Sequence, residues 1–420
     1  MKYKISWNKK DLIGEVNLPP SKSISNRLLI IKALKHSDFL IDNLSGSEDT
    51  IVLNNALNNP GPKINVGQAG TTMRFLTAFF AGRKGEWIIT GTERMENRPI
   101  GELVDALNQL GANIKYLKNK GFPPIKISGR SLKAKFVEID GRISSQFISA
   151  LLLISPTLPY GLRIKLKNKI ISAPYIKMTL SLMKYFGVDS VWNDDEIIVE
   201  KQFYKGKRIS IEGDWSAGSY WYEMAAFADN VDLTIYGLNK ESFQGDAIVA
   251  ELFEPLGIKT TYLSNGIHLS KQKSILKELE FDFTNYPDIV QTLVVTLTMK
   301  NIPLKFIGTD SLRTKETDRI LALKHELAKF GIILKDSPGG ILEWDGEIIR
   351  KLNKVINIAT YKDHRMAMAF APVALLNRKI IIDDPYVVKK SYPEFWEDLK
   401  KAGFTIDNKN GRKIIQKKYR

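Results

Sequence analysis

Short clusters of cations, hydroxyls and carboxylates recur along the 420-residue chain, most of them directly before an apolar segment of helix length. Lysine supplies a compact positive charge, and arginine supplies a planar fork that matches phosphate or carboxylate oxygens. A helix N-terminus adds unpaired N–H groups and the positive end of the helix dipole. Together the clusters indicate a site for a polyanionic ligand, with a few carboxylates for proton transfer. They begin at Ser21, Gly67, Arg94, Ser144, Ser172, Lys315, Asp363 and Lys389.

Each cluster also has an ordinary structural explanation when it is taken alone. Ser23 or Ser25 could simply cap a helix beside solvated cations. Glu316, Asp318 and Asp288 each lie in the first turn of an expected helix, where a carboxylate suits the helix dipole. The recurrence of such clusters at the starts of similar helices favours one shared anion site over a set of unrelated caps.

The composition excludes several classes of chemistry. The chain has no cysteine, which removes disulfides, thiolate nucleophiles and cysteine metal ligands. The four histidines, His36, His268, His325 and His364, lie far apart and in no ligand-like spacing. We therefore expect a reaction that uses neither a metal nor a cofactor.

The formal net charge of +16 fits a nucleic acid, an anionic membrane surface or a small polyanionic substrate. Exposed lysine is the commonest use of lysine, so we expect much of this charge, including the basic residues of 412–420, to be solvated. The first residues lack the apolar core of a signal peptide, and no apolar run is long enough to span a membrane. We expect a cytoplasmic protein.

The segments that follow the clusters form a repeat of roughly 70 residues. Helices that are apolar on most sides are expected to be buried, and here they begin near Ser25, Thr71, Ser144, Ser216, Tyr286 and Asp363. After five of them comes an amphipathic segment that closes on a glycine, the usual residue just past a helix. These glycines are Gly111, Gly187, Gly257, Gly331 and Gly403. The first unit ends differently, at Asn58-Asn59-Pro60-Gly61-Pro62.

Six such α/β units predict compact modules, with three units in each of two globes. If the buried helices run roughly parallel, their N-termini converge on one face and bring the polar clusters together. That the helix N-termini converge is a hypothesis drawn from the sequence.

The motifs SKSISNR, AGTTMR, RPIG, SSQF, NYPD, KETDR, DHRMAM and KSYPEF occur in this order. In this combination the chain resembles the 5-enolpyruvylshikimate-3-phosphate synthase family of enolpyruvyl transferases, from Leu18 to Leu399. KETDR together with DHRMAM is specific, whereas AGT or SKS alone is weak. The resemblance implies a transferase of the shikimate pathway that serves aromatic amino-acid biosynthesis and is the target of glyphosate.

The resemblance also implies a fold. It is a mixed α/β (α+β) fold of two similar globular domains, each of three βαβαββ units arranged like an inside-out α/β barrel, with the active site in the cleft between them. The first domain, the lower globe, would comprise residues 1–20 and 213–420, and the second, the upper globe, residues 21–212. Family members close around their substrates, so we expect hinge motion near the two crossings.

The resemblance further assigns binding residues to two small-molecule substrates. Those matched to shikimate 3-phosphate are Lys22, Ser23, Arg27, Ser144, Ser145, Gln146, Ser172, Tyr175, Asp288 and Lys315. Those matched to phosphoenolpyruvate are Lys22, Gly70, Arg98, Gln146, Arg319, Arg365 and Lys390. We expect no nucleic acid, no membrane and a monomer.

Asp288 matches the base that takes a proton from the 5-hydroxyl, and Glu316 matches the acid that protonates the methylene carbon of phosphoenolpyruvate. Lys22 is a further candidate for proton shuttling. Addition gives a tetrahedral ketal, and loss of phosphate regenerates the vinyl group. The reaction needs an acid and a base that are held apart, each with a tuned pKa. We expect Glu316 to be ionised without substrates and its pKa to rise as they bind.

The chain departs from the family pattern at three positions. Gln68 replaces a usual asparagine, and Phe75 stands where proline often follows the arginine. Ser311 stands where an asparagine commonly contacts substrate, so its role as a ligand is doubtful. Gly70 leaves room beside the phosphoenolpyruvate site, which predicts inhibition by glyphosate.

Two other functions were weighed. The enolpyruvyl transferases that act on UDP-N-acetylglucosamine share fold and co-substrate, but typically use a cysteine, and KETDR argues against them. A nucleic-acid-binding protein would need a continuous basic stripe with exposed aromatic residues. Here Glu316 and Asp288 stand among the cations and would repel a phosphate backbone.

Overall fold

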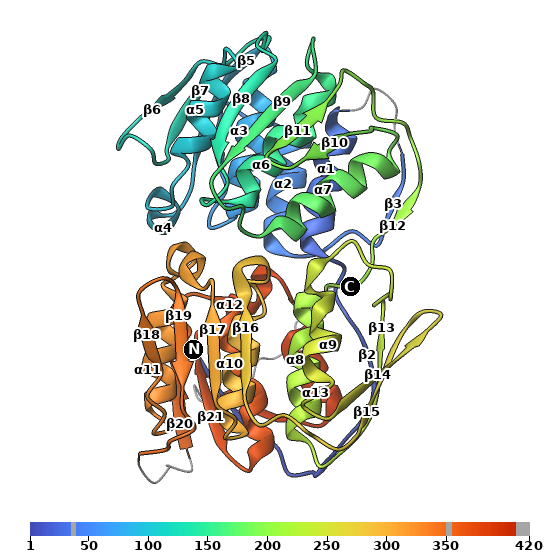
Figure 1. Ribbon diagram of the computed structural model, residues 1–420, viewed down its shortest axis with the longest axis vertical. Coiled ribbons are helices and arrows are strands. Elements are labelled where there is room, and N and C mark those ends of the chain that lie inside the picture. The colour runs from blue at the N-terminus through green and yellow to red at the C-terminus, as the bar shows by residue number, and fades with distance from the viewer. Residues whose placement is uncertain (35–38, 350–354, 409–420) are drawn as a thin grey trace, which may run out of the picture.

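The computed structural model describes residues 1–34, 39–349 and 355–408, and in it the chain forms two bodies stacked along the longest axis (Figure 1). One core of buried apolar side chains draws on residues 24–211, and we call this part the upper body. The other draws on residues 5–18 and 215–404, and we call it the lower body. His36 and the basic segment 412–420 lie outside the described residues.

The chain passes between the bodies at two adjacent places. The Ser21 N–H donates a hydrogen bond of 2.9 Å to the Glu212 carbonyl, and Pro20 pairs with Gly213 in an antiparallel bridge. Because the two passages are hydrogen-bonded to each other, the bodies are joined by one narrow double strand.

The upper body contains two four-stranded sheets and one two-stranded pair. The first sheet has the order β4 (Lys63–Asn65), β5 (Gly85–Thr90), β7 (Ile125–Gly129), β6 (Ile114–Tyr116). The second has the order β8 (Phe136–Asp140), β9 (Leu162–Lys167), β11 (Glu196–Val199), β10 (Val191–Asn193). The pair consists of β3 (Ile41–Asp42) and β12 (Ile209–Ser210).

The lower body contains three four-stranded sheets. The first has the order β2 (Asp11–Asn17), β13 (Asn230–Tyr236), β15 (Gly266–Lys271), β14 (Ile258–Leu263). The second has the order β16 (Leu279–Asp282), β17 (Leu304–Ile307), β19 (Ile341–Trp344), β18 (Lys335–Ser337). The third has the order β20 (Val355–Ile358), β21 (Lys379–Asp383), β1 (Lys2–Ser6), β22 (Thr405–Asn408).

All five four-stranded sheets share one pairing pattern. The first two strands are parallel and the remaining pairings are antiparallel. A parallel pair requires a crossover, and in four of the sheets this crossover contains a buried helix. In β9 buried and exposed residues alternate, as expected for a strand with one face on a core. The repeated α/β architecture predicted from the sequence is confirmed by these sheets.

The first unit departs from the βαβαββ pattern that the resemblance implied for every unit. In the described part of the chain its sheet is the two-stranded pair of β3 and β12. After α2 (Glu48–Asn58) the chain runs through Pro60, Gly61 and Pro62 directly into β4 of the next sheet. Prolines lack the N–H that a sheet ladder requires, so this connection cannot supply the missing antiparallel strands.

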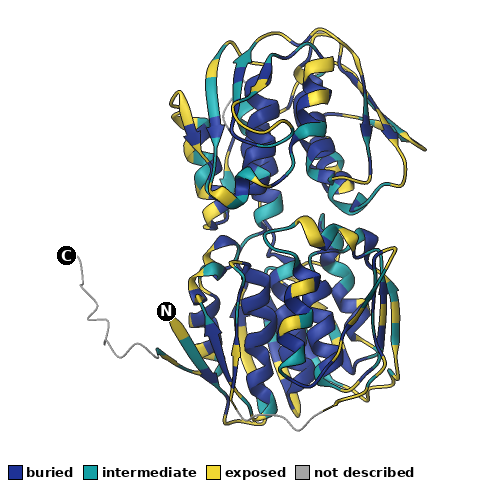
Figure 2. Ribbon diagram, turned by 90° about the vertical axis from the view of Figure 1, so that its left-hand side faces the viewer, coloured by how far each residue is buried: buried dark blue, intermediate teal, exposed yellow. Residues whose placement is uncertain are grey.

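Helices fill the centre of each body, and the segments predicted to be buried are so (Figure 2). The upper body has α1 (Lys22–Leu34), α3 (Gly70–Ala81) and α6 (Ser145–Ile154) in this role. The lower body has α8 (Trp215–Phe227), α10 (Val290–Met299) and α12 (His364–Phe370). These helices are apolar on most sides because neighbouring helices and sheets cover them.

The other helices of the repeats are partly exposed, and most of them end on the predicted glycines. They are α5 (Gly101–Gln109), α7 (Ala173–Tyr185), α9 (Val249–Phe253), α11 (Arg319–Ala328) and α13 (Phe395–Ala402). All five closing glycines have positive φ, between 76° and 118°. A Cβ is disfavoured in that conformation, which is why glycine ends these helices.

Candidate active site

A cavity of about 110 Å³ lies between the two bodies and is lined by polar side chains from both. Its lining from the upper body includes Lys22, Ser23, Arg27, Asp49, Gly70, Thr71, Arg74, Arg98, Ser144, Ser145, Gln146, Ser172 and Tyr175. Its lining from the lower body includes Asp288, Ser311, Thr314, Lys315, Glu316, Arg319, His364 and Arg365. Every residue that the sequence matched to a substrate lines this cavity except Lys390, which contacts the lining residue Glu316.

Helix N-termini from both bodies meet at the cavity. The sequence hypothesis concerned the six buried helices, of which α1, α3, α6 and α12 begin on the cavity lining and α8 and α10 do not. Lys22, Gly70 and Ser145 are the first residues of α1, α3 and α6, and all three line it. Arg319 and His364, the first residues of α11 and α12, line it from the other side. Several positive helix ends therefore point at one small volume, which favours bound anions.

The start of α1 is capped differently from the sequence alternative of Ser23 or Ser25. The Ser21 hydroxyl lies 3.5 Å from the Ile24 N–H, whereas the Ser25 hydroxyl accepts a hydrogen bond from the Ser45 N–H at 3.1 Å. Ser21 precedes the helix, so its side chain can reach the first turn. Ser23 is thereby left facing the cavity.

Arg27 is the most deeply held cation of the upper wall. Its guanidinium donates to the hydroxyls of Thr179 at 2.7 Å and Ser149 at 3.2 Å. It also donates to the carbonyls of Ser23 at 2.8 Å and Tyr175 at 3.1 Å. All these partners are neutral, and burial lowers the pKa of Arg27 to about 10. A bound anion would supply the negative charge that the partners of Arg27 do not provide, whereas Lys22 on the same wall already lies 3.7 Å from Asp49.

Two further arginines of the upper wall, Arg74 and Arg98, lie beside the start of α3. Arg74 donates to the carbonyls of Gly70 at 3.1 Å and Pro99 at 2.6 Å, and burial with the neighbouring Arg98 lowers its pKa. The Arg98 guanidinium lies directly on Gly70, because a Cβ built there would be 2.5 Å from Arg98 Nη1. Glycine at position 70 is therefore required for this placement of Arg98.

Both arginines that line the cavity from the lower body are paired with carboxylates. Arg319 reaches Asp363 at 2.8 Å, Glu316 at 3.1 Å and Asp288 at 3.2 Å. Arg365 reaches Asp288 Oδ2 at 2.9 Å and donates to the Asp288 carbonyl at 2.8 Å. One buried arginine thus links the two carboxylates to which the sequence assigned proton transfer.

Glu316 lies among cations from both bodies. Lys390 Nζ is 2.7 Å from its Oε1 and Arg98 Nη1 is 4.0 Å away. Burial alone would raise the pKa of Glu316, but Lys390, Arg319 and Arg98 lower it well below its usual value. Glu316 is therefore ionised without substrates, in agreement with the sequence expectation.

Asp288 is the second carboxylate on the cavity. The Tyr175 hydroxyl, which comes from the upper body, donates to its Oδ2 at 3.0 Å. Burial would raise the pKa of Asp288, but Arg365, Lys315 and Arg319 outweigh it and lower the pKa strongly. Asp288 is therefore ionised in this arrangement.

Two polar residues of the clusters act as ordinary helix caps, and one of them also lines the cavity. The Ser144 hydroxyl accepts from the Gln146 N–H at 3.3 Å, and the Gln146 amide donates to the Thr71 hydroxyl at 3.2 Å. Asp318 caps α11 by accepting from the Leu321 N–H at 3.0 Å. The ordinary explanation is thus correct for Ser144 and Asp318, and for Ser144 it coexists with exposure to the cavity.

Sequence reasoning missed two residues that belong to the site. Arg94, from α4 (Glu93–Glu96) of the upper body, donates to the carbonyls of Glu316 at 2.7 Å and Lys315 at 2.9 Å. His364 lines the cavity, and burial, then Lys22 and Arg365, lower its pKa well below its usual value, so its ring is neutral. His364 could have been found from its place beside Arg365. Arg94 begins one of the clusters that the sequence marked, but no local signal indicates that its guanidinium reaches the other body.

Comparison with known proteins identifies the family. The family model described as EPSP synthase (3-phosphoshikimate 1-carboxyvinyltransferase) matches residues 7–65 and 52–399. The 3-phosphoshikimate 1-carboxyvinyltransferase of Bacteroides fragilis is 49% identical over 392 residues, which cover 93% of this chain and 95% of that protein. The chain belongs to the EPSP synthase family. The activity predicted from the sequence, that of a 3-phosphoshikimate 1-carboxyvinyltransferase in aromatic amino-acid biosynthesis, is thereby confirmed.

More distant members agree with this assignment. The 3-phosphoshikimate 1-carboxyvinyltransferase of Vibrio campbellii is 35% identical over 418 residues, covering 92% of this chain and 96% of that protein. The solved EPSP synthase of Acinetobacter baumannii superimposes with a TM-score of 0.76 at 20% identity, over 97% of this chain and the whole of that one. This second likeness shows that the EPSP synthase fold is present.

The structure shows what surrounds each of the three residues that depart from the family pattern. Phe75 is buried, and its ring centre lies 5.6 Å from the Arg27 guanidinium. Ser311 lines the cavity, and its hydroxyl has no hydrogen-bond partner among the described residues. Gln68 lines a neighbouring interbody cavity that also contacts Lys390.

The described residues contain neither a membrane-spanning helix nor a cluster of metal-ligating side chains. No helix there is long and apolar enough to cross a lipid bilayer. No group of three or more histidine, cysteine, aspartate or glutamate side chains there is arranged to hold a metal ion.

Proposed function

We propose that the chain transfers the enolpyruvyl group of phosphoenolpyruvate to the 5-hydroxyl of shikimate 3-phosphate in this cavity and releases phosphate. The observation that carries the proposal is that two linked carboxylates, Asp288 and Glu316, share one interbody cavity with cations from both bodies. Two substrates that each bear a phosphate and a carboxylate need such a set of cations to lie side by side.

The proposed substrate contacts follow the family motifs. Shikimate 3-phosphate would bind Lys22, Ser23, Arg27, Ser144, Ser145, Gln146, Ser172, Tyr175, Asp288 and Lys315. Phosphoenolpyruvate would bind Lys22, Gly70, Arg98, Gln146, Arg319, Arg365 and Lys390. The neutral partners of Arg27 support the first set, because this cation stays uncompensated until an anion arrives. The contact between Lys390 and Glu316 supports placing phosphoenolpyruvate near the proposed acid.

In the proposed addition step, Glu316 gives a proton to the methylene carbon of phosphoenolpyruvate, and Asp288 accepts the proton of the attacking 5-hydroxyl. The resulting ketal then loses phosphate as a proton returns from its methyl group to Glu316. Glu316 must therefore gain a proton before addition. Substrate anions that engage Lys390 and Arg98 would weaken the two contacts that hold the pKa of Glu316 low, so binding itself would raise this pKa.

Each body corresponds to one proposed domain, with residues 1–20 and 213–420 in one and 21–212 in the other, and each is built from three related units. Contacts across the cleft support closure as part of the cycle. Arg94 holds the carbonyls of Lys315 and Glu316 from the opposite body, so closure would fix the loop that carries the proposed acid. A monomer in the cytoplasm remains the expectation of the sequence.

Phosphate release tests the proposed function directly. The protein is incubated with both substrates, then with each omitted in turn, and inorganic phosphate is measured. We expect release only when both are present. Release from phosphoenolpyruvate alone, or none with the complete pair, would contradict the proposal. Salt-sensitive binding of an oligonucleotide without phosphate release would instead favour a nucleic-acid-binding protein.

A further inference from the structure

Asp246 is a buried carboxyl group next to the cavity that none of the family motifs includes. It lies in a short 3-10 helix, η2 (Gly245–Ile248), and is only 3% exposed. Its Oδ2 accepts a short hydrogen bond from the Ser216 hydroxyl, whereas its Oδ1 has no partner among the described residues. A buried carboxyl that is only half satisfied is costly to fold, so its presence beside the site calls for a function.

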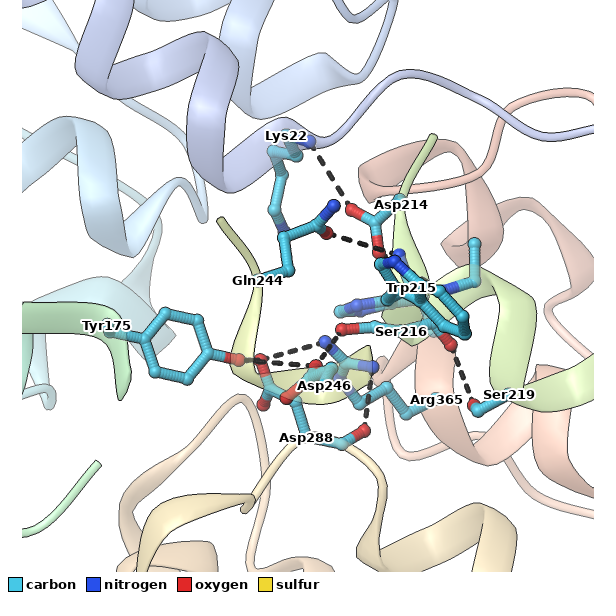
Figure 3. Close-up of polar contacts among 12 residues, drawn as sticks. Lys22, Tyr175, Asp214, Trp215, Ser216, Ser219, Gln244, Asp246, Asp288 and Arg365 are labelled. Atoms are coloured by element: carbon cyan, nitrogen blue, oxygen red, sulfur yellow. Dashed lines mark hydrogen bonds and ion pairs between the residues drawn. The ribbon is translucent and has the colours of Figure 1, made fainter. Parts of the chain in front are cut away.

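The Tyr175 hydroxyl connects Asp246 to the proposed base. It lies 3.0 Å from Asp288 Oδ2 and 3.4 Å from Asp246 Oδ2, so one hydroxyl contacts both carboxyl groups (Figure 3). Tyr175 comes from α7 of the upper body, and both carboxyl groups belong to the lower body. The chain of three groups is therefore complete only when the two bodies are together.

A phenol carries one proton and can donate it to one acceptor at a time. If both carboxyl groups are ionised, only one of them can accept the proton of Tyr175. A proton on Asp246 could instead be donated to the Tyr175 oxygen while Tyr175 donates to Asp288, and its loss leaves a position on Asp246 that another proton can fill. The row Asp288, Tyr175, Asp246 thus has the geometry of a short proton path.

Transfer of a proton from Asp288 to Asp246 requires that Asp246 have the higher pKa, and the surroundings of the two carboxyl groups shift their pKa values in this sense. Burial, with the charge of Asp288, raises the pKa of Asp246 to about 7. At Asp288 the nearby cations outweigh burial and lower the pKa strongly. The titratable and charged groups that face Asp246 are Tyr175 of α7, Asp214 at the start of α8, Asp288 and Tyr286 before α10, and Arg365 of α12. A proton delivered to Asp288 is therefore more stable on Asp246.

We propose that Asp246 is a positioning residue that stores the substrate proton during turnover. The proposal rests on the proposed function of Asp288. The O–H bond of the 5-hydroxyl breaks and its proton passes to Asp288. Asp288 then gives a proton to the Tyr175 oxygen as the Tyr175 proton moves to Asp246 Oδ2. When phosphate departs, the same path runs in reverse and the proton leaves on phosphate, so no further acid or base is needed.

The first test replaces the carboxyl group by an amide of the same shape. Asp246→Asn keeps an oxygen that can accept from Ser216 but removes the proton acceptor. At pH 8 we expect kcat to fall at least about tenfold, with the KM of each substrate within about threefold of wild type. We expect the kcat profile of wild type to have an acidic limb near pH 7, and we expect Asp246→Asn to lose it. A kcat within twofold of wild type, with this limb intact, would overturn the proposal.

The second test leaves the carboxyl group in place and changes only its hydrogen bond. Ser216 stabilises the charged form of Asp246, so Ser216→Ala should raise the Asp246 pKa and move the acidic limb to higher pH by about half a unit or more. The matched control is Ser219→Ala. Ser219 lies one turn along the same helix and contacts the Ser216 carbonyl and Thr292, not Asp246. We expect no displacement of the limb in this control.

The outcomes separate this proposal from the proposed function. Substrate phosphates titrate near pH 6 and could produce an acidic limb of their own. If the acidic limb of the kcat profile lies at the same pH in wild type, Ser216→Ala and Ser219→Ala, it belongs to a group other than Asp246. That result would refute proton storage on Asp246 even in an active enzyme. Absence of phosphate release from the wild-type protein would refute the proposed function instead.

Discussion

The two walls of the cavity present their cations in opposite ways. On the upper wall Arg27 and Arg74 are held by hydroxyls and backbone carbonyls, all of them neutral. On the lower wall Arg319 and Arg365 are held by the carboxylates of Asp288, Glu316 and Asp363. Arg27 and Arg74 are therefore poised to receive anions, whereas the arginines of the lower wall are already neutralised by the carboxylates that include the proposed acid and base. Lys22 is the exception on the upper wall, because it lies 3.7 Å from Asp49.

This difference explains how one small cavity can combine strong anion binding with acid–base chemistry. Buried cations without counter-charges gain the most when a phosphate or carboxylate arrives. Carboxylates already paired with arginine keep fixed positions and perturbed pKa values, which proton transfer needs. The walls come from different bodies, so the combination exists only while the cleft is closed.

The largest expected effect is on the lower wall. Glu316→Gln removes the proposed acid but keeps its shape, so turnover should fall by roughly 100- to 10,000-fold while shikimate 3-phosphate binding stays nearly intact. Steady-state phosphate release and calorimetric titration measure the two quantities. The control is Asp318→Asn, two residues away, which alters the cap of α11 and should leave turnover within a few-fold. Near-normal turnover in Glu316→Gln would remove Glu316 from the proton-transfer step.

The second prediction compares one arginine from each wall in the ligand-free protein. Arg319→Met leaves the buried Asp363 and the partly buried Asp288 and Glu316 without their shared partner and should lower the free energy of unfolding by about 3–5 kcal/mol. Arg27→Met removes hydrogen bonds but also a buried charge, so its loss should be smaller by at least about 2 kcal/mol. Urea unfolding compares the two variants. Equal losses would show that the walls do not differ in charge pairing.

The third prediction concerns the pH dependence of stability. The raised pKa of Asp246 means that the folded protein keeps a proton between about pH 4 and pH 7, where the unfolded chain releases it. Stability from this group is therefore lost as pH rises through that window. Relative to Asp246→Asn, wild type should lose up to about 4 kcal/mol of unfolding free energy between pH 4 and pH 8. Parallel curves for the two proteins would contradict the raised pKa.

A smaller effect is expected at Gly70 on the upper wall. Gly70→Ala places a methyl group against the Arg98 guanidinium and should raise the KM for phosphoenolpyruvate roughly 10- to 100-fold, because charge-assisted hydrogen bonds worth about 1.5–3 kcal/mol are displaced. Gly82→Ala is the control, since its nearest neighbour would be Leu132 at 3.9 Å. Wild type should be inhibited by glyphosate and Gly70→Ala less so. Wild-type activity unaffected by millimolar glyphosate would contradict this.

The smallest predicted effect is at the contact between the walls. Arg94→Ala removes two hydrogen bonds to the loop that carries Glu316 and should lower kcat roughly three- to tenfold, as expected for about 1 kcal/mol. Arg130→Ala is a matched control, because Arg130 also donates to two consecutive carbonyls, those of Gly111 and Ala112, within one body. Equal effects on kcat in the two variants would mean that the contact across the cleft has no special role.

The sequence was sufficient for features whose signals are local. Buried helices, closing glycines and polar clusters at helix starts each depend on a few neighbouring residues, and the structure has them where they were predicted. The family motifs then identified which clusters face one cavity. The departure of the first unit also had a local signal, the Pro60-Gly61-Pro62 turn, but its two-stranded outcome depends on pairing with β12.

Residues whose role depends on distant contacts could not be predicted. Arg94 and Glu316 are 222 positions apart, and nothing around Arg94 indicates that its guanidinium crosses the cleft. Asp246 lies after a glycine in an unremarkable polar turn, and its importance arises only from the approach of Tyr175, 71 positions away. The pairing of cations with neutral groups on one wall and carboxylates on the other is likewise a property of the folded chain.

A crystal structure of the protein with shikimate 3-phosphate bound tests the contrast between the walls most directly. We predict that the phosphate and carboxylate of the ligand lie within hydrogen-bonding distance of upper-wall cations and hydroxyls, while Arg319 keeps its ion pair with Asp363. A ligand bound outside the cavity, or one that breaks the lower-wall ion pairs and leaves the upper wall without contacts, would contradict the account.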